Sequence, residues 1–195
     1  MPTLADLKVP AYWAEGAPSI DPAGFRLAIG GRVARPAALS LDQVRALATD
    51  VVDCRLTSVT RWSVRAQWRG IRAARIAAMV GADPDARFVK LTSAGGGYFT
   101  VVRAGDLEHP GALLALAANG EDLPVEYGGP VRAVFPQLWG YKSAKSVISV
   151  EFRDRNEPGY WESRGYEGDA GITATKLFDL NSRQTRQHGG GEVTW

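Results

Sequence analysis

Alternating apolar and polar positions predict several half-buried strands along the chain. Residues 25–33 (FRLAIGGRV) alternate in this way, and residues 147–152 (VISVEF) do so again later in the sequence. Two further runs, 51–62 and 131–135, are strand candidates. Residues 87–104 hold two β-rich runs around a glycine cluster that tolerates positive φ, so they predict a hairpin.

Two stretches change to a helical period. Residues 39–48 (LSLDQVRALA) place Ser40 and Gln43 at the spacing of a capping box, ahead of an apolar face. Residues 69–83 (RGIRAARIAAMVGAD) predict a second helix that ends at Gly81. The 22 glycines and 11 prolines demand many turns, which favours strands over a helix bundle. We therefore predict one mixed α+β fold, β-rich with short helices.

The composition narrows the class of protein. The 23 basic and 21 acidic residues are interspersed and leave a net charge of +2, which argues against a nucleic-acid partner. The single cysteine excludes an internal disulfide framework and a multi-cysteine zinc site. No stretch approaches the roughly 20 apolar residues that span a bilayer, and the first residues lack the pattern of a secretion signal. We therefore expect a cytoplasmic protein with no transmembrane segment.

Familiar catalytic motifs are absent, but one segment has distinctive chemistry. The patterns GxxxxGK[ST], strand-anchored GxGxxG and HExxH do not occur, and the two histidines, His109 and His188, are expected at solvated positions. In residues 136–152 (PQLWGYKSAKSVISVEF), lysines, serines and turn amides precede an apolar strand, which suits a phosphate. The charge pattern alone favours a solvated strand entrance.

Several segments follow one another in a familiar order. They are residues 20–47 (IDPAGFRLAIGGRVARPAALSLDQVRAL), 59–71 (VTRWSVRAQWRGI), 116–147 (LAANGEDLPVEYGGPVRAVFPQLWGYKSAKSV) and 159–166 (GYWESRGY). In this order they resemble the molybdopterin-binding domain of the sulfite oxidase family, in its bacterial stand-alone form. The resemblance covers about residues 18–165, most of the chain.

The resemblance implies a mixed α+β fold around a deep pocket. In the family this pocket holds the molybdenum cofactor, a pyranopterin with a terminal phosphate. Lys142, Ser143 and Lys145 fall where family members hold the pterin and its phosphate. Tyr141 and Trp62 belong to the same matching motifs, so we expect them in the cofactor site as well.

The residue at the metal-ligand position is a serine. In the bacterial branch of the family, a thiolate four residues before the motif's tryptophan binds molybdenum, and that position here is Ser58. Cys54 lies about 13 Å further along a strand at ~3.3 Å per residue, several times a metal–sulfur bond of roughly 2.3 Å. We therefore expect Cys54 to be a buried, inert core residue.

Three roles are open for Ser58. Its oxygen is a direct metal ligand, or the cofactor binds without a protein ligand, or the domain has lost the metal and kept the fold. Family members often carry an acidic residue before the glycine–tyrosine pair of the hairpin, but here Gly96 precedes Gly97 and Tyr98. This departure favours the second and third roles.

A loaded site of this family transfers an oxygen atom to or from a small oxyanion or an S-oxide. We predict that Arg61 holds an anionic substrate, with Arg55 as the second candidate, although strand alternation places both opposite Ser58. For Arg132 we expect a structural ion pair, with a cofactor contact as the alternative.

The sequence contains no haem-binding or flavin-binding segment, so we expect electrons to come from an external electron-transfer protein or a larger redox complex. The alternative function is a metal-free family member that serves as an accessory or structural subunit of such a complex, for example a respiratory one. Residues 1–170 would then form the molybdopterin-binding-like domain. Residues 171–195, polar and glycine-rich, would form an exposed C-terminal arm for docking.

Overall fold

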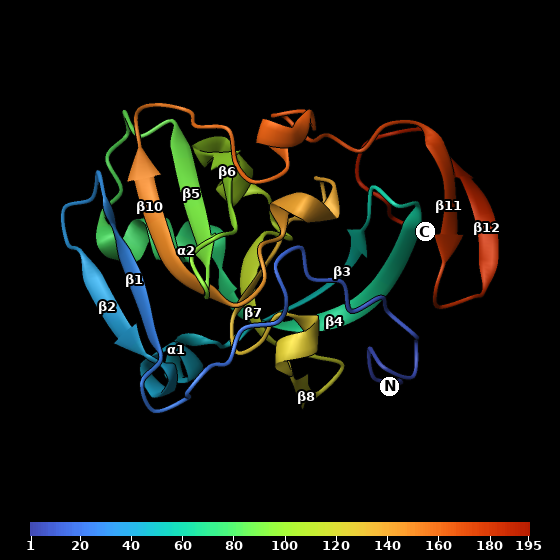
Figure 1. Cartoon of the computed structure of the whole chain (residues 1–195), viewed down its shortest axis with the longest axis horizontal. Coiled ribbons are helices and arrows are strands. Elements are labelled where there is room, and N and C mark those ends of the chain that lie inside the picture. Colours follow the sequence, from blue (N-terminus) through green and yellow to red (C-terminus); the bar gives the residue numbers. More distant parts are fainter.

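Two β-sheets carry the fold of the computed structural model, which describes all 195 residues (Figure 1). One sheet has five strands in the order β2–β1–β10–β5–β6, and the other has seven, in the order β12–β11–β4–β7–β8 with β3 beside β4 and β9 beside β7. These mixed sheets and two short α-helices confirm the predicted α+β class.

The strands are β1 Arg26–Gly31, β2 Ala37–Ser40, β3 Asp50–Thr57, β4 Trp62–Arg72, β5 Phe88–Ser93, β6 Phe99–Arg103, β7 Leu113–Ala118, β8 Glu121–Asp122, β9 Arg132–Val134, β10 Val147–Arg153, β11 Thr175–Asp179 and β12 Gln184–His188. The helices are α1 Leu41–Leu47 and α2 Ala73–Val80, with 3₁₀ turns η1 Ala104–Glu108, η2 Val125–Tyr127, η3 Gly140–Lys142 and η4 Glu162–Arg164.

The five-stranded sheet forms as its alternating sequence predicts. β1 runs parallel to β10, and the apolar positions of both strands point into one core of 26 buried residues. β5 and β6 form the predicted antiparallel hairpin. Ser40 and Gln43 form the predicted capping box of α1, in which the Ser40 amide donates to Gln43 Oε1 at 2.8 Å. Such a cap stabilises a helix by about 1 kcal/mol.

The second helix begins later than the sequence predicted. Residues 70–72 continue β4 and pair with β7, so α2 starts at Ala73. A Cβ at Gly70 would overlap the backbone carbonyl of Leu114, so only glycine lets these two strands approach here. The predicted end is confirmed, because Gly81 adopts φ +61° at the helix terminus.

The strand predicted over residues 51–62 is confirmed as far as Thr57, but its continuation to Trp62 is wrong. β3 ends at Thr57 and the chain reverses before β4 starts at Trp62. The Ser58 amide donates to the Trp62 carbonyl at 2.8 Å, and Arg61 lies in the left-handed region at φ +70°. The Ser58 hydroxyl accepts from the Thr60 amide at 3.2 Å, and a serine that bonds the local backbone in this way favours a turn over a continued strand. Ser58 therefore lies in a tight turn (residues 58–61), not in the middle of a strand.

Residues 171–195 do not form an exposed arm. They contain the β11–β12 hairpin, and β11 pairs in parallel with the start of β4 (Figure 1). Buried Arg55 binds Asp179 of β11 at 2.9 Å and donates to the Trp195 carbonyl. The two histidines were expected at solvated positions, but both bond to residues of this C-terminal segment. His109 faces the Glu192 carboxylate at 3.1 Å, and buried His188 bonds the Gly191 carbonyl at 3.0 Å.

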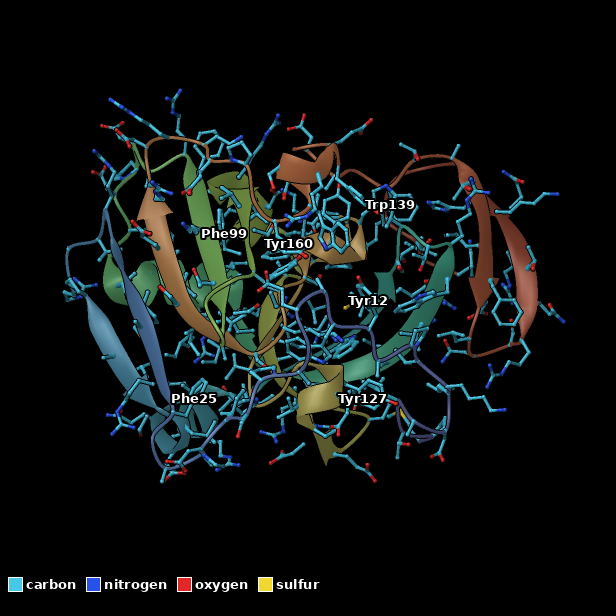
Figure 2. The ribbon with its side chains drawn as sticks, viewed as in Figure 1. Tyr12, Phe25, Phe99, Tyr127, Trp139 and Tyr160 are labelled. Atoms are coloured by element: carbon cyan, nitrogen blue, oxygen red, sulfur yellow. The ribbon has the colours of Figure 1, made fainter.

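The N-terminal segment crosses the middle of the molecule before it reaches β1 (Figure 1). Residues 10–20 contain no regular element, and none of their backbone groups takes part in a backbone–backbone hydrogen bond. Figure 2 shows Tyr12 of this segment near Tyr127 and Tyr160 in the centre, away from Phe25 at the base of the five-stranded sheet. No helix of the structure has the length and apolar character needed to cross a bilayer.

Candidate functional site

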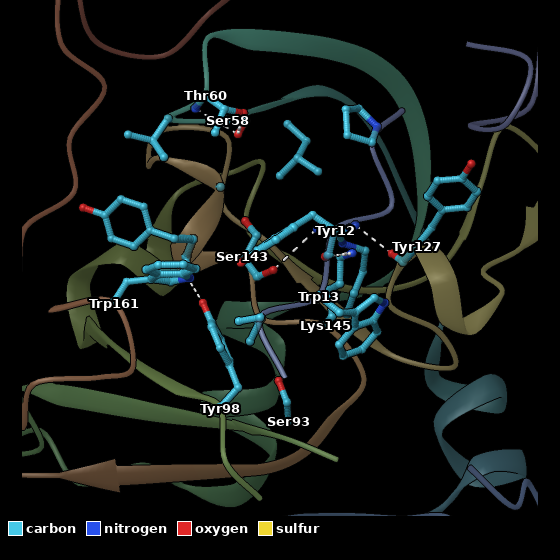
Figure 3. Close-up of a pocket in the computed structure, with 18 of the residues that line it drawn as sticks. Tyr12, Trp13, Ser58, Thr60, Ser93, Tyr98, Tyr127, Ser143, Lys145 and Trp161 are labelled. Atoms are coloured by element: carbon cyan, nitrogen blue, oxygen red, sulfur yellow. Dashed lines mark hydrogen bonds between the residues drawn. The ribbon is translucent and has the colours of Figure 1, made fainter. Parts of the chain in front are cut away.

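A cavity of about 400 Å³ lies where the N-terminal segment meets the two sheets. Its wall comes from the N-terminal segment, the turn of residues 58–61, the β5–β6 hairpin and the segment from Gly140 to Lys145, with Trp161 and Tyr166 at one side. Figure 3 shows Ser58 and Thr60 at one end, Ser93 and Tyr98 at the other, and Lys145 beside Trp13 between them. A cavity of this size and apolar character suits a small cofactor or ligand.

Arg132 places an unpaired positive charge on the cavity wall. Its side chain is 4% exposed and donates only to backbone carbonyls, among them Tyr127 at 2.7 Å and Ser143 at 3.4 Å. No carboxylate lies within ion-pair distance, so the expected structural ion pair of Arg132 is wrong. Burial lowers the pKa of Arg132 to about 10. A buried guanidinium without an acid favours an anionic ligand.

Lys145 adds a second cation to the same wall. Its ammonium donates to the carbonyls of Tyr12 at 2.7 Å and Glu126 at 3.0 Å, and it lies 4.9 Å from the centre of the Trp13 ring. Burial, together with the nearby positive charge of Arg132, lowers the pKa of Lys145 to about 7. A bound anion would raise the pKa of both Arg132 and Lys145 again, so this wall has the electrostatics of an anion site.

The other predicted cofactor residues divide into two groups. Ser143, Tyr141 and Trp62 line the cavity, as expected of a cofactor site. Lys142 does not. Its ammonium is buried against the Glu162 carboxylate and the Val101 carbonyl, 2.6 Å away. Lys142 therefore lies in an internal ion pair and not on the cavity wall, where the cations are Arg132 and Lys145.

Ser58 lies on the cavity wall, but the two arginines predicted to serve it do not. The Ser58 hydroxyl is half-buried and bonds the Thr60 hydroxyl at 2.8 Å. Arg61 is exposed outside the cavity, and its carbonyl accepts from the Phe178 amide at 2.9 Å. Arg55 is held away by Asp179. Neither arginine is thus brought to Ser58.

Aromatic rings close another side of the cavity, where Trp161 lies 6.4 Å from Tyr12 of the N-terminal segment between ring centres. Trp161 contacts Tyr160 and Tyr166 at ring-centre distances of 5.2 and 5.0 Å, and Tyr166 meets Tyr141 edge-on at 5.1 Å. Tyr98 donates to the Tyr141 carbonyl, and burial raises the pKa of the Tyr98 phenol. These neutral rings offer a surface on which a flat ligand can stack, and they add no charge to the cavity.

Cys54 is the buried core residue that its position predicted. It is 8% exposed and packs in a core cluster of 15 buried residues on the sheet that contains β3, β4 and β7, outside the cavity. Burial raises the pKa of its thiol to about 12.

We expect Cys54 of the folded protein to resist iodoacetamide at pH 8, because the thiolate is the reactive form and a thiol of this pKa is neutral there. Unfolding in guanidinium should restore modification at the rate of an ordinary thiol, as measured by intact mass. Rapid labelling of the folded chain would contradict the burial of Cys54.

Comparisons with known proteins found a matching family model and several similar chains. A family model described as an oxidoreductase molybdopterin binding domain matches residues 14–161. An uncharacterized oxidoreductase of Bacillus subtilis, YuiH, is 37% identical over 147 residues, 75% of this chain and 74% of that protein. The protein-methionine-sulfoxide reductase catalytic subunit MsrP of Campylobacter jejuni is 26% identical over 155 residues, 71% of this chain and 52% of that protein. This chain therefore spans about half the length of that reductase subunit.

The fold also matches a solved structure. The sulfane dehydrogenase SoxCD of Paracoccus pantotrophus superposes with a TM-score of 0.68 at 17% identity, over 90% of this chain and 47% of that chain. The family match includes Ser58, Arg132 and Lys145. It begins at residue 14, so it leaves out Tyr12 and Trp13 of the N-terminal wall.

Proposed function

Because this chain belongs to the oxidoreductase molybdopterin-binding domain family, we propose that its cavity holds a molybdopterin cofactor and that the loaded protein reduces an S-oxide. The observation that carries this proposal is Arg132, a buried cation on the cavity wall with no acidic partner. Burying an unpaired charge costs free energy because the charge loses its hydration, and the terminal phosphate of the cofactor would neutralise it.

The residues of the wall fit the two ends of this cofactor. Arg132 and Lys145 would hold the phosphate, and the neutral aromatic wall would receive the pterin rings. Ser58, with Thr60 beside it, would face the metal end, since the ligand position of the family falls there. When bound, the cofactor supplies a molybdenum centre capable of two-electron oxygen-atom transfer.

The charges around Ser58 favour a neutral substrate over an oxyanion. Arg61 and Arg55 lie off the cavity wall, and Lys145 is held at Tyr12 and Trp13, away from the Ser58 end (Figure 3). An anion such as sulfite would therefore find no cation beside Ser58 to offset its loss of hydration. An S-oxide is neutral and needs only hydrogen-bond donors, which the Ser58 and Thr60 hydroxyls supply.

The proposed reaction needs an electron donor. The S-oxide takes up two electrons and two protons, and a thioether and water leave. We propose a separate electron-transfer protein as the donor. The similarity to a protein named as a catalytic subunit supports this arrangement, since that name implies a second component.

The test is the metal and pterin content of protein purified from a host that makes the cofactor. We expect near-stoichiometric molybdenum and a fluorescent pterin after oxidation, and reduction of methionine sulfoxide when a reduced viologen supplies electrons. Faster sulfite oxidation with ferricyanide would overturn the choice of substrate. Protein without either metal or pterin would overturn the proposal and favour a metal-free accessory subunit.

Replacement of Ser58 tests its role at the metal end. We expect Ser58→Ala to keep its pterin but to reduce methionine sulfoxide on the order of 100-fold more slowly, the upper range for loss of a group that supports a metal. Ser149→Ala is the matched control, because Ser149 lies on β10 outside the cavity. Equal rates in Ser58→Ala and wild-type protein would remove Ser58 from the reaction.

A further inference from the structure

The N-terminal wall of the cavity carries an acid that the proposed site has not used. Glu15 lies on this wall, in a segment held to the body by side chains rather than by a backbone ladder. Lys145 fixes the segment through the Tyr12 carbonyl and the Trp13 ring. These contacts set the place of the chain two and three residues before Glu15.

The carboxylate of Glu15 occupies a space that a glycine leaves open. A Cβ built on Gly97, in the β5–β6 hairpin, would overlap both the carboxylate carbon and its oxygens. Gly97 itself does not adopt positive φ, in contrast to Gly95 and Gly96. The backbone conformation at residue 97 therefore admits other residues, and the missing side chain matters because it makes room for Glu15.

Glu15 is free to bind a ligand. It is the only acidic residue on the cavity wall, whose charged residues are otherwise Arg132 and Lys145. None of the salt bridges or side-chain hydrogen bonds of the molecule involves Glu15. The cavity wall thus carries two cations and an unused carboxylate, which suits a ligand with both an anionic group and a pair of N–H donors.

We infer that Glu15 binds the aminopyrimidinone edge of the pterin, an inference that rests on the proposed function. This edge presents an exocyclic amine beside a ring N–H, a planar donor pair that a carboxylate accepts through both oxygens, as it does from a guanidinium. Glu15 then fixes the orientation of the cofactor, because the phosphate lies at Arg132 and the opposite edge at Glu15. The role of Gly97 is to admit the carboxylate.

The test compares two free heterocycles on cofactor-free protein. Pterin carries the donor pair, whereas lumazine has a carbonyl in place of the amine and cannot donate the pair. We expect Glu15→Gln to bind pterin about tenfold more weakly, the loss for one charge-assisted contact, and to bind lumazine within about twofold of wild type. Gly97→Ala should weaken pterin binding equally by displacing the carboxylate.

Matched controls separate this effect from general damage. Glu108→Gln changes an exposed acid outside the cavity, and Gly105→Ala adds a Cβ that meets nothing within 4 Å. Both should bind pterin as wild type does. Pterin binding that Glu15→Gln leaves unchanged, an equal loss for lumazine, or no binding of free pterin by wild type would each overturn the inference.

Failure of the inference differs from failure of the proposed function. If Glu15 has no role, natively purified protein still contains pterin and only the Glu15→Gln comparison fails. If the cavity does not hold molybdopterin, the native protein contains no pterin in the first place. Arg132→Met gives a third signature, because it should lose the native cofactor and yet bind phosphate-free pterin normally.

Discussion

Arg132→Met is expected to purify without its cofactor, with at least a hundredfold less pterin and molybdenum per protein than wild type. The guanidinium is buried, lies on the cavity wall and has no acid to pair with, so the phosphate of the proposed cofactor would be its counter-ion. Hydrogen bonds between charged groups in such a site contribute about 1.5–3 kcal/mol each, and a guanidinium makes several. Metal analysis and pterin fluorescence of the purified variant measure the loss.

The same substitution should leave the cofactor-free protein stable. Burial lowers the pKa of Arg132 to about 10, so at neutral pH the folded state bears the cost of keeping this base charged. Methionine removes that cost but also the bonds to the backbone carbonyls, and the two changes offset one another. We expect a Tm within about 4 °C of cofactor-free wild type.

Arg26→Met is the matched control for this experiment. Arg26 also lacks an acidic partner, but it is exposed, donates to the Phe25 carbonyl at 2.7 Å and does not line the cavity. Its loss should change neither cofactor content nor Tm. Full cofactor retention in Arg132→Met would show that the phosphate binds elsewhere and would remove the observation on which the proposed function stands.

Features set by local sequence were predictable. The capping box of α1, the glycine end of α2 and the alternation of β1 and β10 depend on residues within a few positions of each other. The family was also predictable, because its motifs keep their order along the chain. Cys54 could be placed correctly by strand length alone, since no bulge moves a thiol by four residues.

Features that depend on distant partners were not predictable. Lys142 and Lys145 lie in one motif, yet Glu162 neutralises the first and no acid reaches the second. The partner of each lysine is decided by which distant segment packs there, and spacing does not encode it. Arg132 was expected to find an acid, as most buried arginines do. Its lack of one is visible only once the surrounding elements are in place.

The N-terminal wall and the C-terminal hairpin also depend on distant partners, so the sequence did not predict them. Residues 10–20 have no hydrophobic period and form no backbone–backbone hydrogen bonds, so nothing in their sequence placed Trp13 or Glu15 at the cavity. Residues 171–195 appeared too polar to pack alone, and they do not pack alone. β11 adds to the edge of β4 and is fixed by the buried Arg55–Asp179 pair.

Lys142→Met is expected to destabilise the protein by about 3–5 kcal/mol, the usual cost of breaking a buried ion pair on one side. The Lys142 and Glu162 side chains are 2% and 8% exposed, and Glu162 Oε2 already lacks a hydrogen-bond partner. Without the ammonium, the Glu162 carboxylate retains only Thr100 as a donor, at 3.1 Å. For a chain of this size the loss corresponds to a fall in Tm of about 10 °C, measurable by calorimetry.

A second substitution distinguishes an uncompensated charge from lost packing. Lys142→Met combined with Glu162→Gln removes both charges, so the double variant should recover more than half of the lost stability. Cofactor-free protein is the right sample, because any difference in cofactor content would otherwise enter the Tm. If Lys142→Met instead kept its stability and lost its pterin, the ammonium would serve the phosphate after all. Lys142 would then be the cation that binds the cofactor, and Arg132 would be a structural cation of the core.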